Sequence, residues 1–512
     1  MVKALLPGIV FLLAWQEPPA NPIDAHFALK WKSEGLAPAS PANDYDFHRR
    51  LTIDLLGRLP TPDEIRAHIA DKKTDKRMRL VDRLLASEEC AEFMADLWLD
   101  ILVDHEVTQQ DFARSDLGPF RNWLRARFFE DTPYPDIVRA LLSDRGGRRA
   151  KPAVNFSLKH LGAEPLPVKL AVMSARLFSN RDIRCAQCHD HPFEPMTQEE
   201  FWGYVEFFRP LRNRGDLVEV ASSSRGEPKA EFGELTDCKP RFLDGRAPEE
   251  GDRLGAALAE LTLTAKDRSS SRALVDRVWR HFFGRNIAPP NPKARGRRDL
   301  AEAIVTDFEQ RGQSLRKLMR TIVTSQAYQL TSAGKDSDRE AYAVGPLKLM
   351  GAVQFFNAFA DIFNLHEMHQ QMYKKVEESS VAGQQFKDPQ VMKIMFTRWS
   401  QELLLPRGRD PEEAMAAGTV RMAIKFMNNK RTTGMMIAQW GLLAKIISKK
   451  SRPGDRVEEL YLSLLGRPPS EQEKREYVEY LDAGNNMVTG DYKKYEDILW
   501  VLVNSSEFLF NR

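Results

Sequence analysis

The sequence contains little cysteine and no large excess of charge of either sign. Its four cysteines among 512 residues are too few for a disulfide framework of the kind that holds small secreted domains together. The 75 basic and 72 acidic residues leave a net charge of only +3, so the molecule as a whole has no field that attracts nucleic acid. The composition is that of an ordinary globular protein, and we expect no nucleic-acid partner.

Long hydrophobic runs are also absent. Lys3 precedes an apolar stretch from Ala4 to Ala14, which is too short to cross a bilayer because a spanning helix needs about 20 residues. We interpret residues 1–22 as a signal peptide with a proline-rich spacer, and we expect no transmembrane segment after it. The expectation is therefore an exported protein of the periplasm or the cell surface.

The common catalytic motifs are missing too, and one haem-attachment motif stands out instead. The sequence has no G-x-S-x-G, P-loop or H-E-x-x-H pattern, so it indicates no class of enzyme. It does contain the run Cys185-Ala186-Gln187-Cys188-His189. C-x-x-C-H is the attachment signature of a c-type haem, in which two thiols add to the vinyl groups and the histidine binds the iron. The motif predicts covalent haem c on Cys185, Cys188 and His189.

Other chemistry fits the same motif. A non-haem metal, zinc or iron, could be held by Cys185 and Cys188 with His189 or His191, and Cys238 could complete the set. A redox dithiol or a purely structural turn is a further reading. His191 with Asp190 and Glu194 could form an acid–base cluster, although an Asp at such a place more often caps a turn. Cys90 lies in an apolar helical pattern and is expected to be a small core residue.

The second axial ligand of a bound haem is left open by the sequence. An iron with no sixth ligand would favour ligand binding or peroxide chemistry over electron transfer alone. The candidate ligands are His191, Met196, His160, Met173 and His281.

Helical periodicity runs through almost the whole chain and predicts a mainly α fold. We predict an N-terminal helical domain over residues 40–208, a β-containing linker over 209–250 and a C-terminal helical domain over 251–512. The alternation at Leu217–Val220 predicts a strand in the linker. The C-x-x-C-H motif is expected on a loop between a helix over 168–179 and a helix that Thr197 and Glu200 begin with a capping box.

A short pattern occurs twice and predicts two related helix–turn–helix units. Leu55–Glu64 and Leu464–Glu473 both end one helix at a Gly-Arg pair and begin the next with Thr or Ser followed by Glu. Each is followed by a leucine-rich helix that ends in Ser and Glu, over 84–89 and over 502–507. Phe282–Arg285, with Ile322–Ser325 after it, is a weaker third copy. A repeated packing unit explains this pattern better than three active sites do.

A family resemblance rests on Arg49–Thr61, Leu80–Ser87 and Cys185–Pro195 in a first domain, and on Phe242–Gly245, Val278–Arg285 and Leu502–Phe510 in a second. On these residues, the sequence resembles the planctomycete cytochrome-like proteins in which two domains of unknown function are fused. The resemblance covers most of the chain and implies an exported bacterial protein that handles electrons, with a redox partner, or that supports the breakdown of extracellular polymers. It implies no particular enzymatic reaction. The alternative function is a non-haem metal-binding protein or a helical interaction scaffold without catalytic activity.

Overall fold

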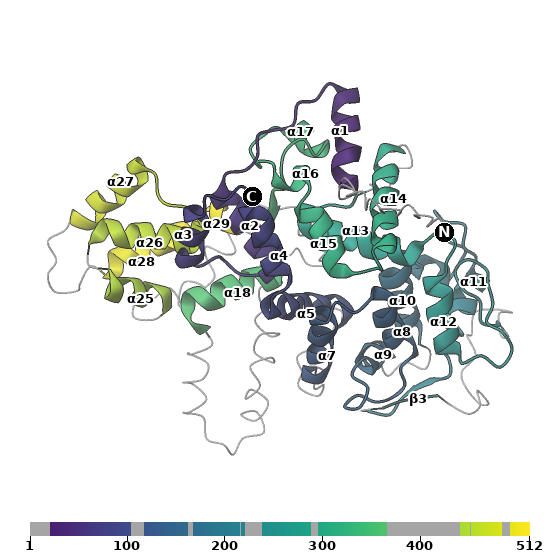
Figure 1. Cartoon of the computed structure of the whole chain (residues 1–512). Helices are drawn as coiled ribbons and strands as arrows, with labels where there is room; N and C mark the ends of the chain where they lie inside the picture. Colours follow the sequence, from purple (N-terminus) through teal and green to yellow (C-terminus); the bar gives the residue numbers. More distant parts are fainter. Residues whose placement is uncertain are drawn as a thin grey trace, which may run out of the picture.

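The structure is a computed structural model in which most of the chain is helical (Figure 1), which confirms the predicted fold class. Of the predicted signal peptide and spacer, residues 1–20 lie outside the described residues, and the predicted end of the spacer is wrong because Asn21 caps helix α1 and Pro22 begins it. No helix among the described residues is long and apolar enough to cross a membrane. The structure describes residues 21–103, 117–161, 167–215, 217–220, 238–287, 295–365, 441–450, 452–483 and 492–512.

The helices before the predicted linker pack into the larger part of the molecule. The C-x-x-C-H motif begins within the short 3-10 helix η1, between α10 and α11. The helices are α1 (Pro22–Glu34), α2 (Asp44–Leu56), α3 (Pro62–Ala70), α4 (Lys76–Leu85), α5 (Glu88–Val103), α7 (Gly118–Phe129), α8 (Tyr134–Ser143), α9 (Val154–Leu161), α10 (Val168–Ser179), η1 (Arg184–Gln187) and α11 (Gln198–Val205).

Helices that follow the predicted linker are found at both ends of the molecule. In Figure 1, α25 to α28 group at one end of the molecule, whereas α12 lies near the other end beside α8. These helices are α12 (Leu254–Leu263), α13 (Ser269–Phe283), α14 (Arg295–Gln310), α15 (Leu315–Val323), α16 (Gln326–Gln329), α17 (Asp336–Glu340), α18 (Ala352–Phe363), α25 (Gly441–Lys449), α26 (Pro453–Leu465), α27 (Glu471–Asp482), α28 (Tyr492–Val503) and α29 (Ser506–Leu509).

Two small antiparallel sheets complete the described structure. The first has the order β1-β3-β2, formed by β1 (Gly146–Gly147), β2 (Leu211–Asn213) and β3 (Leu217–Val220). The predicted strand at Leu217–Val220 is confirmed, and it pairs with glycines that come about 70 residues earlier in the sequence. The second sheet joins β4 (Lys348–Leu349) to β5 (Phe510–Asn511), with Lys348 opposite Asn511. Neither β4 nor β5 was predicted.

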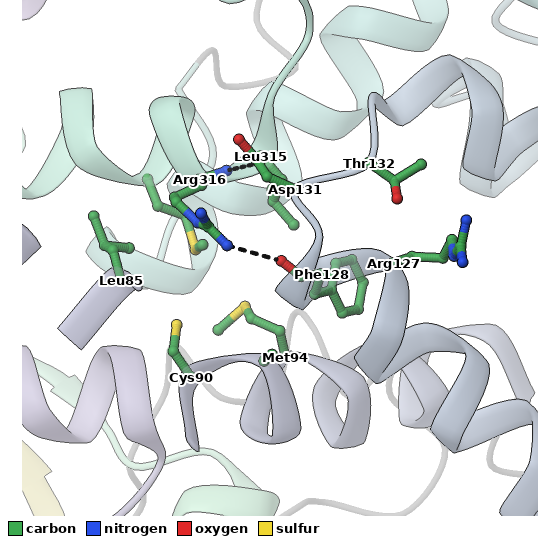
Figure 2. A pocket seen from close by; sticks show the side chains of 11 residues that line it. Leu85, Cys90, Met94, Arg127, Phe128, Asp131, Thr132, Leu315 and Arg316 are labelled. Carbon is green, nitrogen blue, oxygen red and sulfur yellow. Dashed lines mark hydrogen bonds between the residues drawn. The ribbon is translucent and has the colours of Figure 1, made fainter. Parts of the chain in front are cut away.

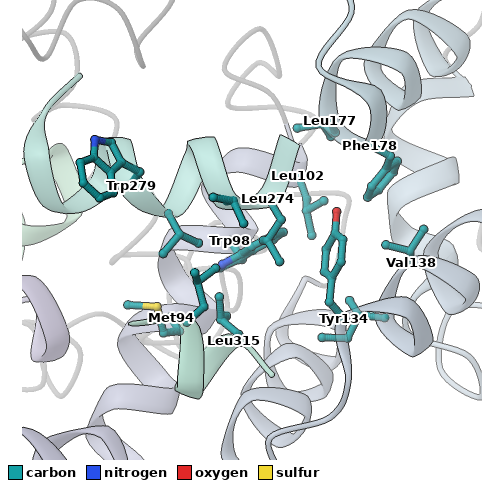
Figure 3. Close-up of a cluster of buried hydrophobic side chains, with 14 of the residues drawn as sticks. Met94, Trp98, Leu102, Tyr134, Val138, Leu177, Phe178, Leu274, Trp279 and Leu315 are labelled. Carbon is teal, nitrogen blue, oxygen red and sulfur yellow. The ribbon is translucent and has the colours of Figure 1, made fainter. Parts of the chain in front are cut away.

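Two hydrophobic clusters form the interior, and they divide the chain differently from the linker. The larger cluster holds side chains from the helices α1 to α11, except α3, together with those of α12 to α16. Figure 3 shows Trp98 of α5 and Tyr134 of α8 in this cluster, near Leu274 and Trp279 of α13. The smaller cluster is built from α18 and α25 to α29, and it also takes in Ile53 of α2 and Leu59. Helices from both sides of the predicted linker share the larger cluster, so the clusters do not test the predicted domain boundaries. These boundaries stay a prediction.

The two predicted helix–turn–helix units have the same local structure. Gly57 and Gly466 both end a helix in the left-handed conformation, with φ of 68° and 74°. The left-handed region favours glycine, which lacks the Cβ that makes this conformation costly for other residues. Thr61 begins α3 and Ser470 begins α27, each in a complete capping box. The predicted repeat is therefore confirmed at the level of its hydrogen bonds.

An arginine clasp also repeats between the two units. Arg58 binds Glu64 at 2.8 Å and also pairs with Glu89. Arg467 pairs in the same way with Glu473 at 2.8 Å and with Glu507 at 2.6 Å. Each clasp ties the turn of a unit to the beginning of a later helix, α5 or α29. The repeated sequence pattern includes all four glutamates, but it was not predicted that one arginine binds both glutamates of a unit.

The third copy keeps part of this pattern. Gly284 ends α13 with φ of 71°, and Ser325 caps α16 by accepting a hydrogen bond from the Tyr328 N–H. Ser87 and Ser505 make the equivalent bonds in the first two copies, to the N–H groups of Cys90 and Phe508. Ala327 stands where the clasps have Glu89 and Glu507, and Arg285 instead lies over the ring of Tyr342.

Candidate functional site

The C-x-x-C-H loop is fixed at both ends by helix termini. Helix α10 ends at Asn180, which adopts the left-handed conformation with φ of 51°. Helix α11 begins after Thr197, whose side chain accepts a hydrogen bond from the Glu200 N–H in the predicted capping box. The Gln198 side chain donates to the carbonyl of Gln187 at 3.0 Å and so ties the beginning of α11 to the motif. The predicted position between two helices is confirmed.

In η1 and the residues at its two ends, the apolar side chains are buried and the two thiols lie at the surface. Ile183 and Ala186 are fully buried, and the Ala186 N–H donates to the Ile183 carbonyl at 3.0 Å. Cys185 and Cys188 are both exposed, and neither forms a disulfide. The turn is therefore anchored by its small apolar residue, while both sulfur atoms stay open to a reaction partner from solvent.

The two histidines of the loop present different nitrogen atoms. His189 Nδ1 lies 2.7 Å from the carbonyl of Asp190, so this nitrogen carries the proton. In the neutral ring, its Nε2 is then the nitrogen with the lone pair, and it has no hydrogen-bond partner among the described residues. His191 Nδ1 instead accepts from the N–H groups of Phe193 at 3.2 Å and Glu194 at 3.0 Å. In the neutral ring, the proton of His191 is therefore on Nε2.

This difference favours His189 over His191 as a ligand of iron or another metal. Metal-binding histidines usually donate one ring N–H to a carbonyl or carboxylate, which fixes the tautomer and directs the other nitrogen to the metal. His189 has that arrangement. His191 would have to give up two backbone hydrogen bonds before its Nε2 could lose the proton, and in this conformation it stabilises the loop.

The acidic residues of the loop are also engaged in holding it together. The Asp190 carboxylate accepts from the Gln198 N–H at 2.9 Å, which agrees with the turn-capping reading of this residue. Glu194 pairs with Arg181 at 3.1 Å, and the same arginine donates to the carbonyl of Leu243. An acid–base cluster of Asp190, His191 and Glu194 would have to break these contacts.

Three of the five candidates for a second axial ligand, Met196, His160 and Met173, are buried side chains, and the other two, His191 and His281, are half-buried. Met196 is 5% exposed, and its backbone pairs with His191 at 2.8 Å. His160 binds the carbonyl of Leu102 at 2.7 Å, and His281 binds that of Asp54 at 2.8 Å. Met173 is a core residue, as are the aromatic side chains of α11. The aromatic side chains that follow the motif are therefore part of the ordinary core.

The alternative metal set stays a prediction. Cys238 is half-buried and packs against the larger hydrophobic cluster. Within the described ranges, which include all five proposed ligands, no three or more Cys, His, Asp or Glu side chains are grouped to hold a metal ion. The residues present fit covalent attachment and one axial ligand better, because that arrangement needs only the two exposed thiols and the free Nε2 of His189.

Cys90 is a core residue, as predicted, and lies beside a small cavity. The cavity of about 10 Å³, enough for one water molecule, lies among α5, α7 and α15 (Figure 2). Burial raises the pKa of the Cys90 thiol to about 12, so the thiol stays protonated and unreactive. Arg316 bridges the rim by donating to the Phe129 carbonyl at 2.7 Å. This cavity has no connection with the chemistry of the loop.

Comparison with protein families divides the chain in two. Residues 22–213 match the family PSCyt2, described as a protein of unknown function (DUF1549), and residues 254–481 match PSD1, described as a protein of unknown function (DUF1553). The chain is a fusion of these two domains. The DUF1549 match contains the C-x-x-C-H loop and the unit at Gly57, and the DUF1553 match contains the unit at Gly466. No curated protein and no solved structure was found to match the chain.

Proposed function

We propose that the DUF1549 loop attaches one haem c covalently and that the protein is an exported cytochrome-like redox protein. The observation that carries the proposal is the arrangement of three groups. The thiols of Cys185 and Cys188 are exposed and unpaired, and the hydrogen bond from His189 Nδ1 to the Asp190 carbonyl leaves Nε2 as the ligand atom. The family resemblance and the apolar N-terminal stretch support export.

The roles of the residues follow from this arrangement. Cys185 and Cys188 would hold the haem through their sulfur atoms, and His189 would bind its iron. The hydrogen bond to Asp190 would fix the ring and raise the basicity of Nε2. Haem supplies one-electron chemistry when bound, at a potential set by the ligands and their exposure. The exposed loop would leave one haem edge accessible to a redox partner protein.

Covalent attachment is tested by mass and by colour. The full chain with its export signal should be made in a host with haem-attachment machinery, alongside a Cys185→Ser/Cys188→Ser variant. We expect the denatured wild-type protein to be heavier by one haem and to show a Soret band, and the variant to show neither. Cys238→Ser is the matched control, because it removes one cysteine outside the motif and should keep both signals.

The role of His189 as an iron ligand is tested separately, by the visible spectrum. His189→Ala should keep the added mass, because the two thioethers remain, but it should shift the visible spectrum of the reduced protein. His191→Ala should leave that spectrum unchanged if His191 only stabilises the loop. Exported wild-type protein with the bare polypeptide mass would contradict the proposal. Stoichiometric zinc or iron in such a preparation would support the non-haem metal site, and its absence would support a scaffold.

A further inference from the structure

A buried cluster of polar side chains lies where the two hydrophobic clusters meet, far along the sequence from the C-x-x-C-H loop. Asp54, at the end of α2, is fully buried. Its carboxylate oxygen Oδ1 lies 2.7 Å from Lys348 Nζ and 2.8 Å from Asn511 Nδ2. Its other oxygen, Oδ2, accepts from the Tyr328 hydroxyl at 2.8 Å. One carboxylate thus contacts residues from three distant parts of the chain.

Lys348 and Asn511 are held side by side in two independent ways. They are direct partners in the antiparallel pair β4–β5, where facing Cβ atoms lie about 5 Å apart. Their side-chain nitrogens also share a single oxygen of Asp54. The side chain of Lys348 is 7% exposed and Asn511 is 1% exposed, so water does not separate the two.

An ion pair alone does not explain all the groups in this cluster. Taking a lysine and a carboxylate out of water costs several kcal/mol per ion, and the attraction between them offsets that cost only in part. Asn511 Oδ1 is buried without a hydrogen-bond partner among the described residues. Amide nitrogen and oxygen are assigned from their neighbours, and a half-turn of this amide would direct Oδ1 at Asp54. A protonated Asp54 would then donate to it and polarise the amide carbonyl.

We propose that Lys348 and Asn511 become joined by an isopeptide bond, with Asp54 as the catalytic acid and base. Lys348 first passes one proton to Asp54 along their hydrogen bond, which leaves a neutral amine and a neutral carboxylic acid. Nζ then attacks Cγ of Asn511, and the Nζ–Cγ bond forms as the Cγ–Nδ2 bond breaks. Asp54 relays a second proton from Nζ to Nδ2, which leaves as ammonia, and Asp54 stays protonated. No oxidant or other reactant is needed.

The surroundings favour the neutral amine that this step requires. Burial, together with the nearby Arg50, lowers the pKa of Lys348, although Asp54 opposes the shift. Lys348 also donates to the carbonyl of His281, which holds Nζ at the junction. Tyr328 and Gln354 are positioning residues: Tyr328 binds the second oxygen of Asp54, and Gln354 donates to the Ile53 carbonyl at 2.9 Å beside it.

Peptide mapping of the wild-type protein tests whether the isopeptide bond is present. After denaturation, trypsin cannot cleave after Lys348 if its Nζ is acylated. We expect the peptide that contains Lys348 to be recovered joined to Tyr495–Arg512, at a combined mass lower by one ammonia than the sum of the two. Recovery of free Tyr495–Arg512 and of a peptide that ends at Lys348 would overturn the proposal. A product lower by one water, with Lys348 joined to Asp54, would overturn the assignment of Asn511.

Variants separate the chemical role from a structural one. Asn511→Ala keeps the Lys348–Asp54 pair but removes the amide, so the joined peptide should disappear. Asn504→Ala is the matched control, because it changes the other asparagine of the same tryptic peptide. The Asn504 side chain donates to the carbonyl of Trp500, and this variant should keep the joined peptide. Lys348→Arg retains the charge and removes the primary amine. Persistence of the ammonia loss in Asn511→Ala would contradict the proposal.

Discussion

The units at Gly57 and at Gly466 have the same turn, capping box and arginine clasp, but they differ in what surrounds them. Gly57 faces the ring of Phe93 in the larger cluster, whereas Gly466 faces the methylene groups of Arg49. Nine residues before the glycine, the first unit has the buried His48 and the second has the buried Val457. The comparison shows that the short sequence pattern sets the turn, while the packing around it sets how much change the turn can tolerate.

Replacing each glycine by alanine should give the largest difference between the units. Alanine at either position must adopt a positive φ, which costs roughly 1 kcal/mol. At Gly57 the new Cβ would also overlap the ring of Phe93, a rigid side chain in the core, so we expect a loss of about 3 kcal/mol. At Gly466 the nearest atom is Arg49 Cβ at 3.1 Å, and a loss of about 1.5 kcal/mol is expected.

Urea unfolding of the two alanine variants measures this difference as a shift in the transition midpoint. Equal losses in Gly57→Ala and Gly466→Ala would show that φ alone decides the cost. A double variant, Gly57→Ala with Phe93→Leu, sharpens the test because the smaller side chain should recover part of the loss at Gly57 only.

The second prediction concerns stability in acid between pH 6.5 and 4, where the first unit has a buried histidine and the second has none. Burial and the stacked His68 lower the pKa of His48 from 6.5 to about 4. The unfolded chain therefore binds more protons than the folded one in this range, and stability falls as the pH falls from 6.5 to 4. The loss should be on the order of 2 kcal/mol. Above pH 6.5 the contribution of His48 is constant.

His48→Val gives the first unit the residue of the second and should make this part of the pH profile less steep, while His281 contributes the same dependence in both proteins. Chemical denaturation at several pH values between 4 and 7 provides the measurement. His48 Nδ1 is buried without a partner among the described residues, so the variant should lose little stability at pH 7. An unchanged slope in His48→Val would assign the acid sensitivity to other groups, of which His281 is the first to test because burial also lowers its pKa to about 4.

The smallest effect is expected at the helix caps, and it should be nearly equal in the two units. Thr61→Ala and Ser470→Ala each remove one oxygen that accepts an N–H at 3.2 Å, from Glu64 and from Glu473. Each change should cost about 1 kcal/mol. Thermal unfolding of the two variants should therefore give similar shifts, and a loss several times larger in one of them would show that the caps are not equivalent. Thr61→Ser is the matched control that keeps the oxygen.

The sequence predicted the features that neighbouring residues determine. Capping boxes at Thr61, Thr197 and Ser470 and the glycine ends of α2 and α26 are written in four to ten consecutive residues, and all were confirmed. The strand at Leu217–Val220 was predicted from its alternation. Its partner β1 was not, because two glycines carry no side-chain pattern.

Contacts between distant residues could not be predicted in this way. Nothing near Asp54 indicates that it meets Lys348 and Asn511, because that meeting depends on how α2 packs against both clusters. At the candidate site, the sequence supplied Cys185, Cys188 and His189 but not the hydrogen bonds that distinguish His189 from His191. Those bonds depend on the path of the backbone from Asp190 to Glu194, which composition and spacing do not fix.

The position of Asn511 has a consequence for the order in which the chain can fold. Its side chain binds Asp54, which is separated from it by 457 positions in the sequence. Contacts of such long sequence range form late, because the entropy of closing the loop must be overcome before they contribute. The N-terminal helices would therefore keep an incompletely satisfied carboxylate until residues near 510 have been synthesised. Because this contact forms last, the N-terminal helices remain incompletely packed for most of the time in which the chain is synthesised.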